Sequence, residues 1–173
     1  VGAGAGAADP DRARGNYSRS KALAERLALQ AASDRFAVVA VRPHLVWGPG
    51  DTQLVGRIVE RASQGRLATI GTGAALIDTT YVDNAADALI AAARRCTALT
   101  GRAFVVTNGE PRTVAEIVAR ITRAAGQKAP NVSVPAPVAR AGGSLAEGVW
   151  RVTKRVGDPP MTAFVAEQLS TAH

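Results

Sequence analysis

The chain has 173 residues, of which 47% are hydrophobic and 20% charged, so it has enough apolar material for a globular core and is neither disordered nor a disulfide scaffold. Its net charge of +7 comes mainly from arginines spread along the chain, and only 4% of residues are aromatic. A nucleic-acid partner is therefore not expected. The only cysteine is Cys96, which excludes an internal disulfide and favours a reducing compartment, with the cytoplasm as the default.

The first third of the chain predicts a loop, a helix and a strand. Residues 1–15 begin with alternating glycine and alanine, a composition typical of a flexible lead or loop. Residues 16–32 are rich in helix-forming residues with apolar positions along one side. Residues 36–41 (FAVVAV) form a continuous apolar run that stops at Arg42 and Pro43, which predicts an interior parallel strand, buried on both faces.

The middle third predicts two further pairs of helix and strand. Asp51 is placed to cap a helix that ends at Gly65, and residues 75–82 read as a strand. Asp83 begins the next helix, which extends to about residue 93, and residues 103–107 form a short buried strand.

In the last third, Thr113 and Glu116 form a capping-box pattern before a helix. A strand at residues 131–134 precedes a helix at 138–156, and a short helix at 163–169 follows. Strands and helices alternate without an internal repeat, which predicts an α/β fold with helices on the faces of a sheet.

Tyr17 and Lys21 are four residues apart near the start of the first predicted helix, so they share one face. The side chain of tyrosine ordinarily has a pKa of about 10, and a neighbouring ammonium group favours the phenolate needed for acid/base catalysis. A pair at this spacing is also common on helix surfaces. The context of the pair therefore decides between chemistry and a solvated surface.

That context is supplied by residues 42–51 (RPHLVWGPGD) and residues 78–87 (DTTYVDNAAD). Together with the Tyr17 segment, in this order and spacing, they resemble the extended short-chain dehydrogenase/reductase superfamily, and most closely the 3β-hydroxysteroid dehydrogenase/isomerase branch. The resemblance covers roughly residues 9–173. It implies the C-terminal part of a Rossmann-like doubly wound parallel sheet, interleaved over residues 16–130 with a small α/β substrate-binding lobe that continues as a lobe or lid over residues 131–173.

The resemblance also implies roles for individual residues. Tyr17 would be the catalytic acid/base, and Lys21 would bind the nicotinamide ribose and favour the Tyr17 phenolate, so both residues also contact the cofactor. Pro43 and the backbone of His44 and Leu45 would lie beside the nicotinamide, at the carboxyl end of the strand. Trp47 would lie near the substrate entrance. The ring of His44 could also bind substrate, although a purely backbone role is favoured.

Three further features receive structural interpretations. Asp83 and Asn84 are expected to cap the helix that they begin. The apolar stripe of residues 138–156, surrounded by arginines and lysines, favours a lid over the substrate, with contact to an anionic membrane as the less favoured alternative. No cluster of His, Cys, Asp and Glu has the spacing of a metal site.

Two parts of the family pattern are missing from the sequence: the glycine-rich phosphate loop and the catalytic serine upstream of Tyr17. The alternating glycines at the start of the chain are not followed by an apolar helix and are not expected to bind phosphate. We therefore expect the chain to be part of a protein roughly twice as long, inactive as an isolated fragment.

The functional hypothesis is an NAD- or NADP-dependent oxidoreductase that acts on the CH–OH group of a sterol-like or other secondary alcohol, with a homodimer suggested by the resemblance. One alternative is a nucleotide-sugar epimerase or dehydratase, in which Arg57, Arg61 and Arg112 could contact a diphosphate, or a carbonyl reductase. The alternative of another class is a non-catalytic remnant or interaction module.

Overall fold

The computed structural model describes residues 6–13, 15–153, 169 and 171. They form two compact units that alternate along the chain. The sheet unit contains residues 2–48 and 79–110, and the lobe unit contains residues 49–78 and 111–173. Each unit is described by itself below.

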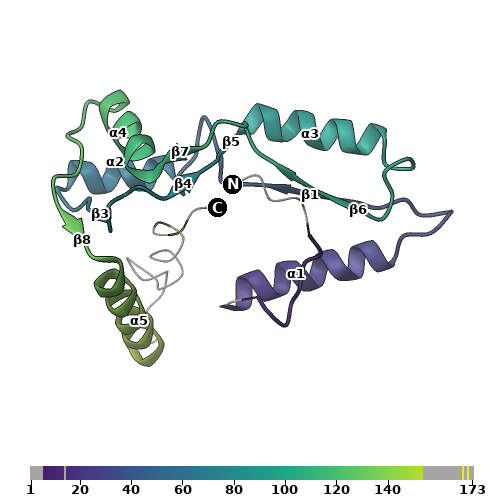
Figure 1. Cartoon of the computed structure of the whole chain (residues 1–173), viewed down its shortest axis with the longest axis horizontal. Coiled ribbons are helices and arrows are strands. Elements are labelled where there is room, and N and C mark those ends of the chain that lie inside the picture. Colours follow the sequence, from purple (N-terminus) through teal and green to yellow (C-terminus); the bar gives the residue numbers. More distant parts are fainter. Residues whose placement is uncertain (1–5, 14, 154–168, 170, 172–173) are drawn as a thin grey trace. The chain divides into compact units, whose positions relative to one another are not determined.

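The sheet unit is built on two parallel strands between two helices. Strand β1 (Val39–Pro43) pairs in parallel with β6 (Arg102–Val106), and the shorter β2 (Val46–Trp47) pairs in parallel with β5 (Thr80–Tyr81). Helices α1 (Gly15–Gln30) and α3 (Val82–Arg94) both contact β1, and Figure 1 shows them on opposite faces of the β1 and β6 pair. This arrangement confirms the predicted α/β class.

The first strand is parallel, as predicted, but it starts later and is less buried than expected. Ser33 and Phe36 exchange backbone hydrogen bonds, so residue 36 closes a turn and the strand begins at Val39. Pro43 lies within the strand, because the bond that continues the ladder comes from the His44 N–H to the Val106 carbonyl. All five residues of β1 are half-buried, since β6 is the one described strand that pairs with it.

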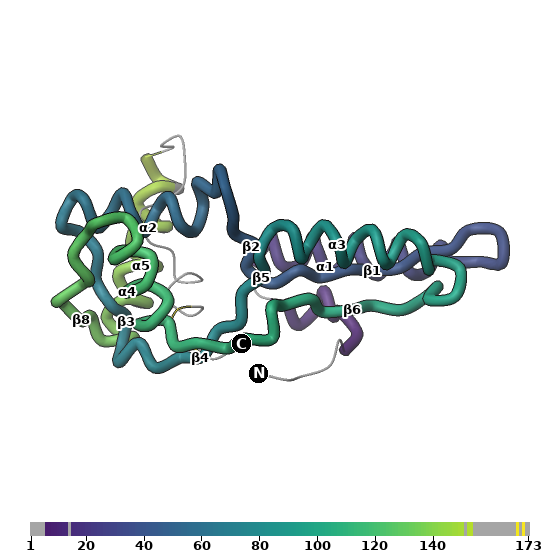
Figure 2. Tube along the Cα trace, turned by 90° about the horizontal axis from the view of Figure 1, so that it is seen from above, coloured from purple at the N-terminus to yellow at the C-terminus, as the bar shows by residue number. Residues whose placement is uncertain are grey.

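As far as its residues are described, the lobe unit contains three helices and two pairs of short strands. Its helices are α2 (Val55–Ser63), α4 (Val114–Ala124) and α5 (Ala136–Thr153). Strand β3 (Thr69–Ile70) pairs in parallel with β8 (Ser133–Val134), and β4 (Leu76–Ile77) pairs antiparallel with β7 (Arg112–Thr113). Figure 2 follows the chain through these elements. A small core forms where Ile70 on β3 packs with Ala139 on α5.

The prediction of a single strand at residues 75–82 is wrong. The segment contains two strands, β4 and β5, separated at Asp78 and Thr79. β4 pairs with β7 in the lobe unit, whereas β5 pairs with β2 in the sheet unit. A segment that reads as one strand, apart from Asp78, therefore contains the passage from one unit to the other.

The capping box predicted for α4 forms only in part. The Thr113 hydroxyl accepts a hydrogen bond from the Glu116 N–H at 3.1 Å, as predicted. The Glu116 carboxylate instead forms ion pairs with Arg112 and Arg120, because two guanidinium groups on neighbouring turns attract it more strongly than a backbone N–H group.

Helix α5 confirms the helix predicted near residues 138–156 as far as Thr153, where the described part of the helix ends. The short helix predicted at residues 163–169 lies outside the described residues, except for Leu169. Among the helices of the described chain, none has both the length and the apolar character needed to cross a membrane.

Candidate active site

Tyr17 and Lys21 lie on the first two turns of α1. The Tyr17 side chain is 73% exposed, Lys21 is also exposed, and their spacing of four residues places them on one face of the helix. The Ser20 hydroxyl donates to the Tyr17 carbonyl at 2.8 Å, a bond within the first turns of α1. Both side chains are therefore accessible to a small molecule from the same side.

The carboxyl end of β1 carries a strained residue. The His44 N–H donates to the Val106 carbonyl at 3.0 Å. The next residue, Leu45, has a φ of 43°, in the left-handed region that non-glycine residues rarely occupy. Its carbonyl accepts a hydrogen bond from the Thr80 N–H at 3.2 Å. Strain of this kind is often found at functional sites, where the surrounding structure enforces it.

Thr80 enforces that conformation and was not anticipated from the sequence. The residue is completely buried, and its hydroxyl lies 2.7 Å from the His44 carbonyl and 2.9 Å from the Val106 carbonyl. One hydroxyl proton shared between two carbonyls joins the ends of β1 and β6 to β5. The sequence offers one signal for this role, a hydroxyl residue just before the apolar start of α3.

Trp47 is held by contacts on two sides. Its indole N–H donates to the Thr79 hydroxyl at 3.0 Å, and its ring meets the Tyr81 ring edge-on, with 5.2 Å between centroids. The side chain nevertheless remains 36% exposed. Trp47 therefore presents a fixed apolar surface within the sheet unit, next to the residues that follow β1.

The start of α3 is held differently from the prediction for Asp83 and Asn84. The N-cap residue is Tyr81, without a side-chain capping bond. Asn108, which follows β6, accepts hydrogen bonds from the Tyr81 N–H and from the Asn84 amide, both at 2.9 Å. The capping prediction is thus wrong, because Asn84 binds across the unit to Asn108. Asp83 lies in the first turn, where its charge interacts favourably with the helix dipole.

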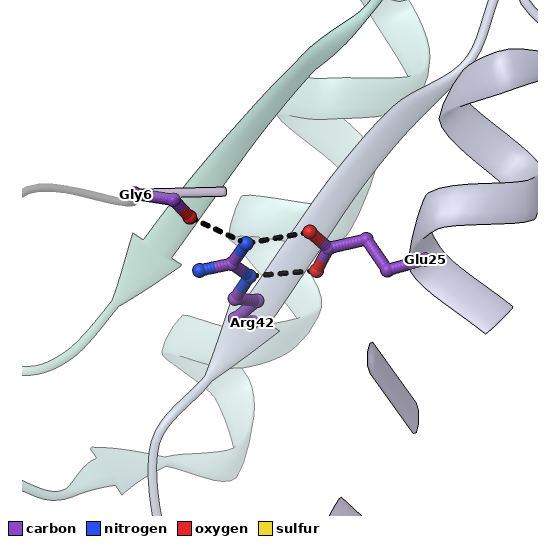
Figure 3. Close-up of polar contacts among 3 residues, drawn as sticks. All are labelled: Gly6, Glu25 and Arg42. Carbon is purple, nitrogen blue, oxygen red and sulfur yellow. Dashed lines mark hydrogen bonds and ion pairs between the residues drawn. The ribbon is translucent and has the colours of Figure 1, made fainter. Parts of the chain in front are cut away.

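An ion pair connects the helix that carries Tyr17 to the strand that leads to His44. Arg42 on β1 donates through Nε to one oxygen of Glu25 on α1 at 2.6 Å and through Nη2 to the other oxygen at 2.5 Å (Figure 3). The hydrogen bond to Glu25 raises the pKa of Arg42. Burial opposes this shift, and the negative charge of Glu25 adds to it. Sequence reasoning overlooked this pair, because the two residues are 17 positions apart.

All the predicted site residues lie in the sheet unit. His44, Leu45 and Trp47 are joined through Thr79, Thr80 and Tyr81. Pro43 is the last residue of β1, paired with Val106, and Tyr17 and Lys21 are on the helix that is anchored to this strand by Glu25.

These residues suit the nicotinamide half of a dinucleotide. The exposed tyrosine carries a hydroxyl group that can transfer a proton, and the exposed lysine carries a cation. The strained end of β1 offers backbone groups to a ligand at the carboxyl edge of parallel strands. The sequence contains no G-x-G-x-x-G pattern for the pyrophosphate. No group of His, Cys, Asp and Glu within the described chain could hold a metal ion.

The parallel strands flanked by helices, with this group of residues at their carboxyl end, define a Rossmann-like α/β unit. The model of the 3-beta hydroxysteroid dehydrogenase/isomerase family matches residues 8–136. The chain therefore belongs to this family.

Individual relatives agree with the family assignment. The chain is 42% identical over 160 residues to a 2-alkyl-3-oxoalkanoate reductase from Stenotrophomonas maltophilia, a match that covers 91% of this chain and 48% of the reductase. It is 38% identical over 125 residues to the decarboxylating sterol-4-alpha-carboxylate 3-dehydrogenase of Bos taurus, covering 69% and 35% of the two chains. The chain thus spans about half the length of the reductase.

The fold is also found in a solved structure, that of MoeE5 in complex with UDP-glucose and NAD. The two chains are 26% identical and superpose with a TM-score of 0.57, over 70% of this chain and 42% of MoeE5.

Proposed function

We propose that the protein containing this chain is an NAD(P)-dependent oxidoreductase that interconverts a secondary alcohol and a ketone. The observation that carries the proposal is the exposed pair of Tyr17 and Lys21 on a helix anchored to the strand that ends at His44. The names of the relatives, a reductase and a dehydrogenase, support the reaction class. NAD in the MoeE5 complex supports the cofactor.

In this proposal the described residues bind and orient the cofactor and transfer one proton. Tyr17 donates its hydroxyl proton to the ketone oxygen in reduction and accepts it back in oxidation. Lys21 stabilises the phenolate and holds the ribose, while Pro43 and the backbone of His44 and Leu45 line the nicotinamide. When bound, the dinucleotide supplies or accepts the hydride.

The names of the two relatives also suggest a substrate class. In a 2-alkyl-3-oxoalkanoate, the ketone carbon is bonded directly to the carbon that bears the carboxylate. A sterol-4-alpha-carboxylate that reacts at position 3 has the same arrangement. We infer that the substrate is a ketone or alcohol of this kind, attached to a large apolar group. The sterol-like alcohol expected from the sequence belongs to this class only when it carries such a carboxylate.

The lobe unit offers apolar surface for such a group. Val138, Leu145, Val149 and Val152 are exposed on α5, and Leu145 and Val152 are 71% and 83% exposed. We propose that residues 131–173 form a substrate-binding lobe or lid, in which the exposed apolar surface of α5 receives the apolar body of the substrate. A substrate contact by Trp47 is a separate proposal, made for the sheet unit by itself. A nucleotide sugar, the ligand in the MoeE5 complex, is the second candidate and would need polar contacts instead.

The substrate class can be tested with the whole protein and matched substrates. Oxidation of NADH and NADPH is followed spectrophotometrically with a 2-alkyl-3-oxoalkanoate and with its methyl ester. Conversion of UDP-glucose in the presence of NAD is followed by chromatography of the products, because an epimerase or dehydratase regenerates its NAD. We expect kcat/KM for the acid to exceed that for the ester by about tenfold or more, because the ester cannot form a charge-assisted contact through its carboxylate. Equal values would remove the carboxylate from the proposal. Turnover of UDP-glucose alone would favour the second candidate.

A further inference from the structure

The Glu25/Arg42 ion pair lies on the same helix face as Tyr17 and Lys21. Tyr17, Lys21 and Glu25 follow one another at intervals of four residues along α1, so each lies above the previous one on a single face. Lys21 is thus one turn, about 6 Å along the axis, from both Tyr17 and Glu25. The Glu25 carboxylate is a natural partner for the Lys21 ammonium.

Arg42 binds both oxygens of that carboxylate. Its Nε and Nη2 atoms bind separate oxygens of Glu25, and Nη2 also donates to the Gly6 carbonyl at 2.9 Å (Figure 3). The Glu25 side chain is only 13% exposed, so solvent competes little with the guanidinium. A two-pronged bond of this geometry is stronger than a single contact to a flexible ammonium group.

We propose that Arg42 and Glu25 are positioning residues for the Tyr17 and Lys21 chemistry, in which Arg42 anchors the helix and keeps Glu25 from pairing with Lys21. This inference rests on the proposed function. It assigns a role in the reaction to two residues that would otherwise be taken as a structural ion pair.

The effect of the pair on Tyr17 passes through Lys21. Glu25 is two turns, about 12 Å along the axis, from Tyr17, beyond the screening length of about 8 Å at physiological salt. Lys21 lies between them. If Arg42 is removed, Glu25 gains an unpaired charge and draws the Lys21 ammonium away from Tyr17, which disfavours the phenolate.

The other charges near this face are few. Among the elements that pack on α1, β1 contributes Arg42 as its charged residue. In the described parts of α1 and of the segment before it, the remaining charged residues are Arg19 and Arg26 on α1 and Asp9, Asp11 and Arg12 before it.

The test is the pH profile of alcohol oxidation by the whole protein, in which kcat rises with pH as the phenolate forms. In Arg42→Met we expect the midpoint to move up by about one pH unit, with an approximately tenfold fall in kcat at neutral pH. In Glu25→Gln the midpoint should not rise. In the double variant it should return to the wild-type value, because the carboxylate that diverts Lys21 is gone.

A purely structural ion pair gives a different result. It predicts that all three variants lose kcat without a change of midpoint, and this outcome would overturn the proposal. The midpoint does not depend on the amount of folded enzyme, so partial unfolding does not obscure it. Should Arg42→Met fail to fold, Arg42→Lys replaces it; a smaller upward shift supports the proposal, and an unshifted profile contradicts it.

Two controls separate this proposal from the one on which it rests. Arg26→Met removes another exposed arginine from the same helix and should leave kcat and the midpoint unchanged. If Tyr17→Phe keeps full activity, the proposed function fails. If Tyr17→Phe abolishes activity but the Arg42 and Glu25 variants keep the wild-type midpoint, only the positioning role fails.

Discussion

At the scale of single residues, the sequence predicted side chains whose chemistry is local and missed those that act across the fold. Tyr17 and Lys21 were predicted from their spacing of four residues together with the two motif segments that follow them. Thr80, which binds the His44 carbonyl 36 positions away, and Asn108, which binds the Tyr81 N–H 27 positions away, were not found. Their contacts depend on strand pairing, which periodicity does not reveal.

Thr80 provides the sharpest test at this scale. Replacing it with valine keeps the shape but leaves the His44 and Val106 carbonyls without its hydroxyl in a completely buried site. We expect Thr80→Val to lower the free energy of unfolding by about 1–3 kcal/mol, measured by urea denaturation. Thr80→Ser retains the hydroxyl and should lose less. Equal stability of Thr80→Val and the wild type would show that the hydroxyl does not join the strands.

At the scale of elements, helices were predicted better than strands. α3 begins and ends within one residue of the prediction, and α4 begins directly after its predicted cap Thr113, because apolar spacing and end residues act locally. β2, β3 and β7 have two residues each, too few to show any period. The division of residues 75–82 into β4 and β5 follows from different partner strands, which only the three-dimensional structure shows.

Asp51 tests how the start of α2 is stabilised. Burial opposes its charge, but hydrogen bonds from the N–H groups of Val55, Leu54 and Gln53 outweigh burial and lower the pKa of Asp51. A depressed pKa stabilises the fold above the unfolded value of about 4, and this contribution is lost as pH falls through the folded pKa.

The variant that isolates this charge is Asp51→Asn, which keeps one acceptor oxygen. Its deficit in unfolding free energy should be constant near neutral pH and should shrink below about pH 4. Asp34→Asn, at an exposed position, is the control and should show little deficit. A deficit for Asp51→Asn that does not change with pH would contradict the assignment.

At the scale of the whole molecule, the α/β class and the family were predictable because three motif segments occur in the right order. The two interleaved units were harder to foresee, because one crossing between them, at Asp78 and Thr79, lies inside a segment that reads as a single strand. Exposed apolar side chains remain on both units, among them Leu27 and Leu145. Assembly as a homodimer stays a prediction.

The most direct measurement is ketone reduction by the whole protein and its Tyr17→Phe variant, with dinucleotide affinity measured in parallel. Tyr81→Phe removes the only other phenol hydroxyl of this chain and serves as the matched control. We predict that Tyr17→Phe lowers kcat by about 100-fold or more, with dinucleotide binding retained and Tyr81→Phe active. A Tyr17→Phe variant as active as the wild type would contradict the role of Tyr17 as the acid/base.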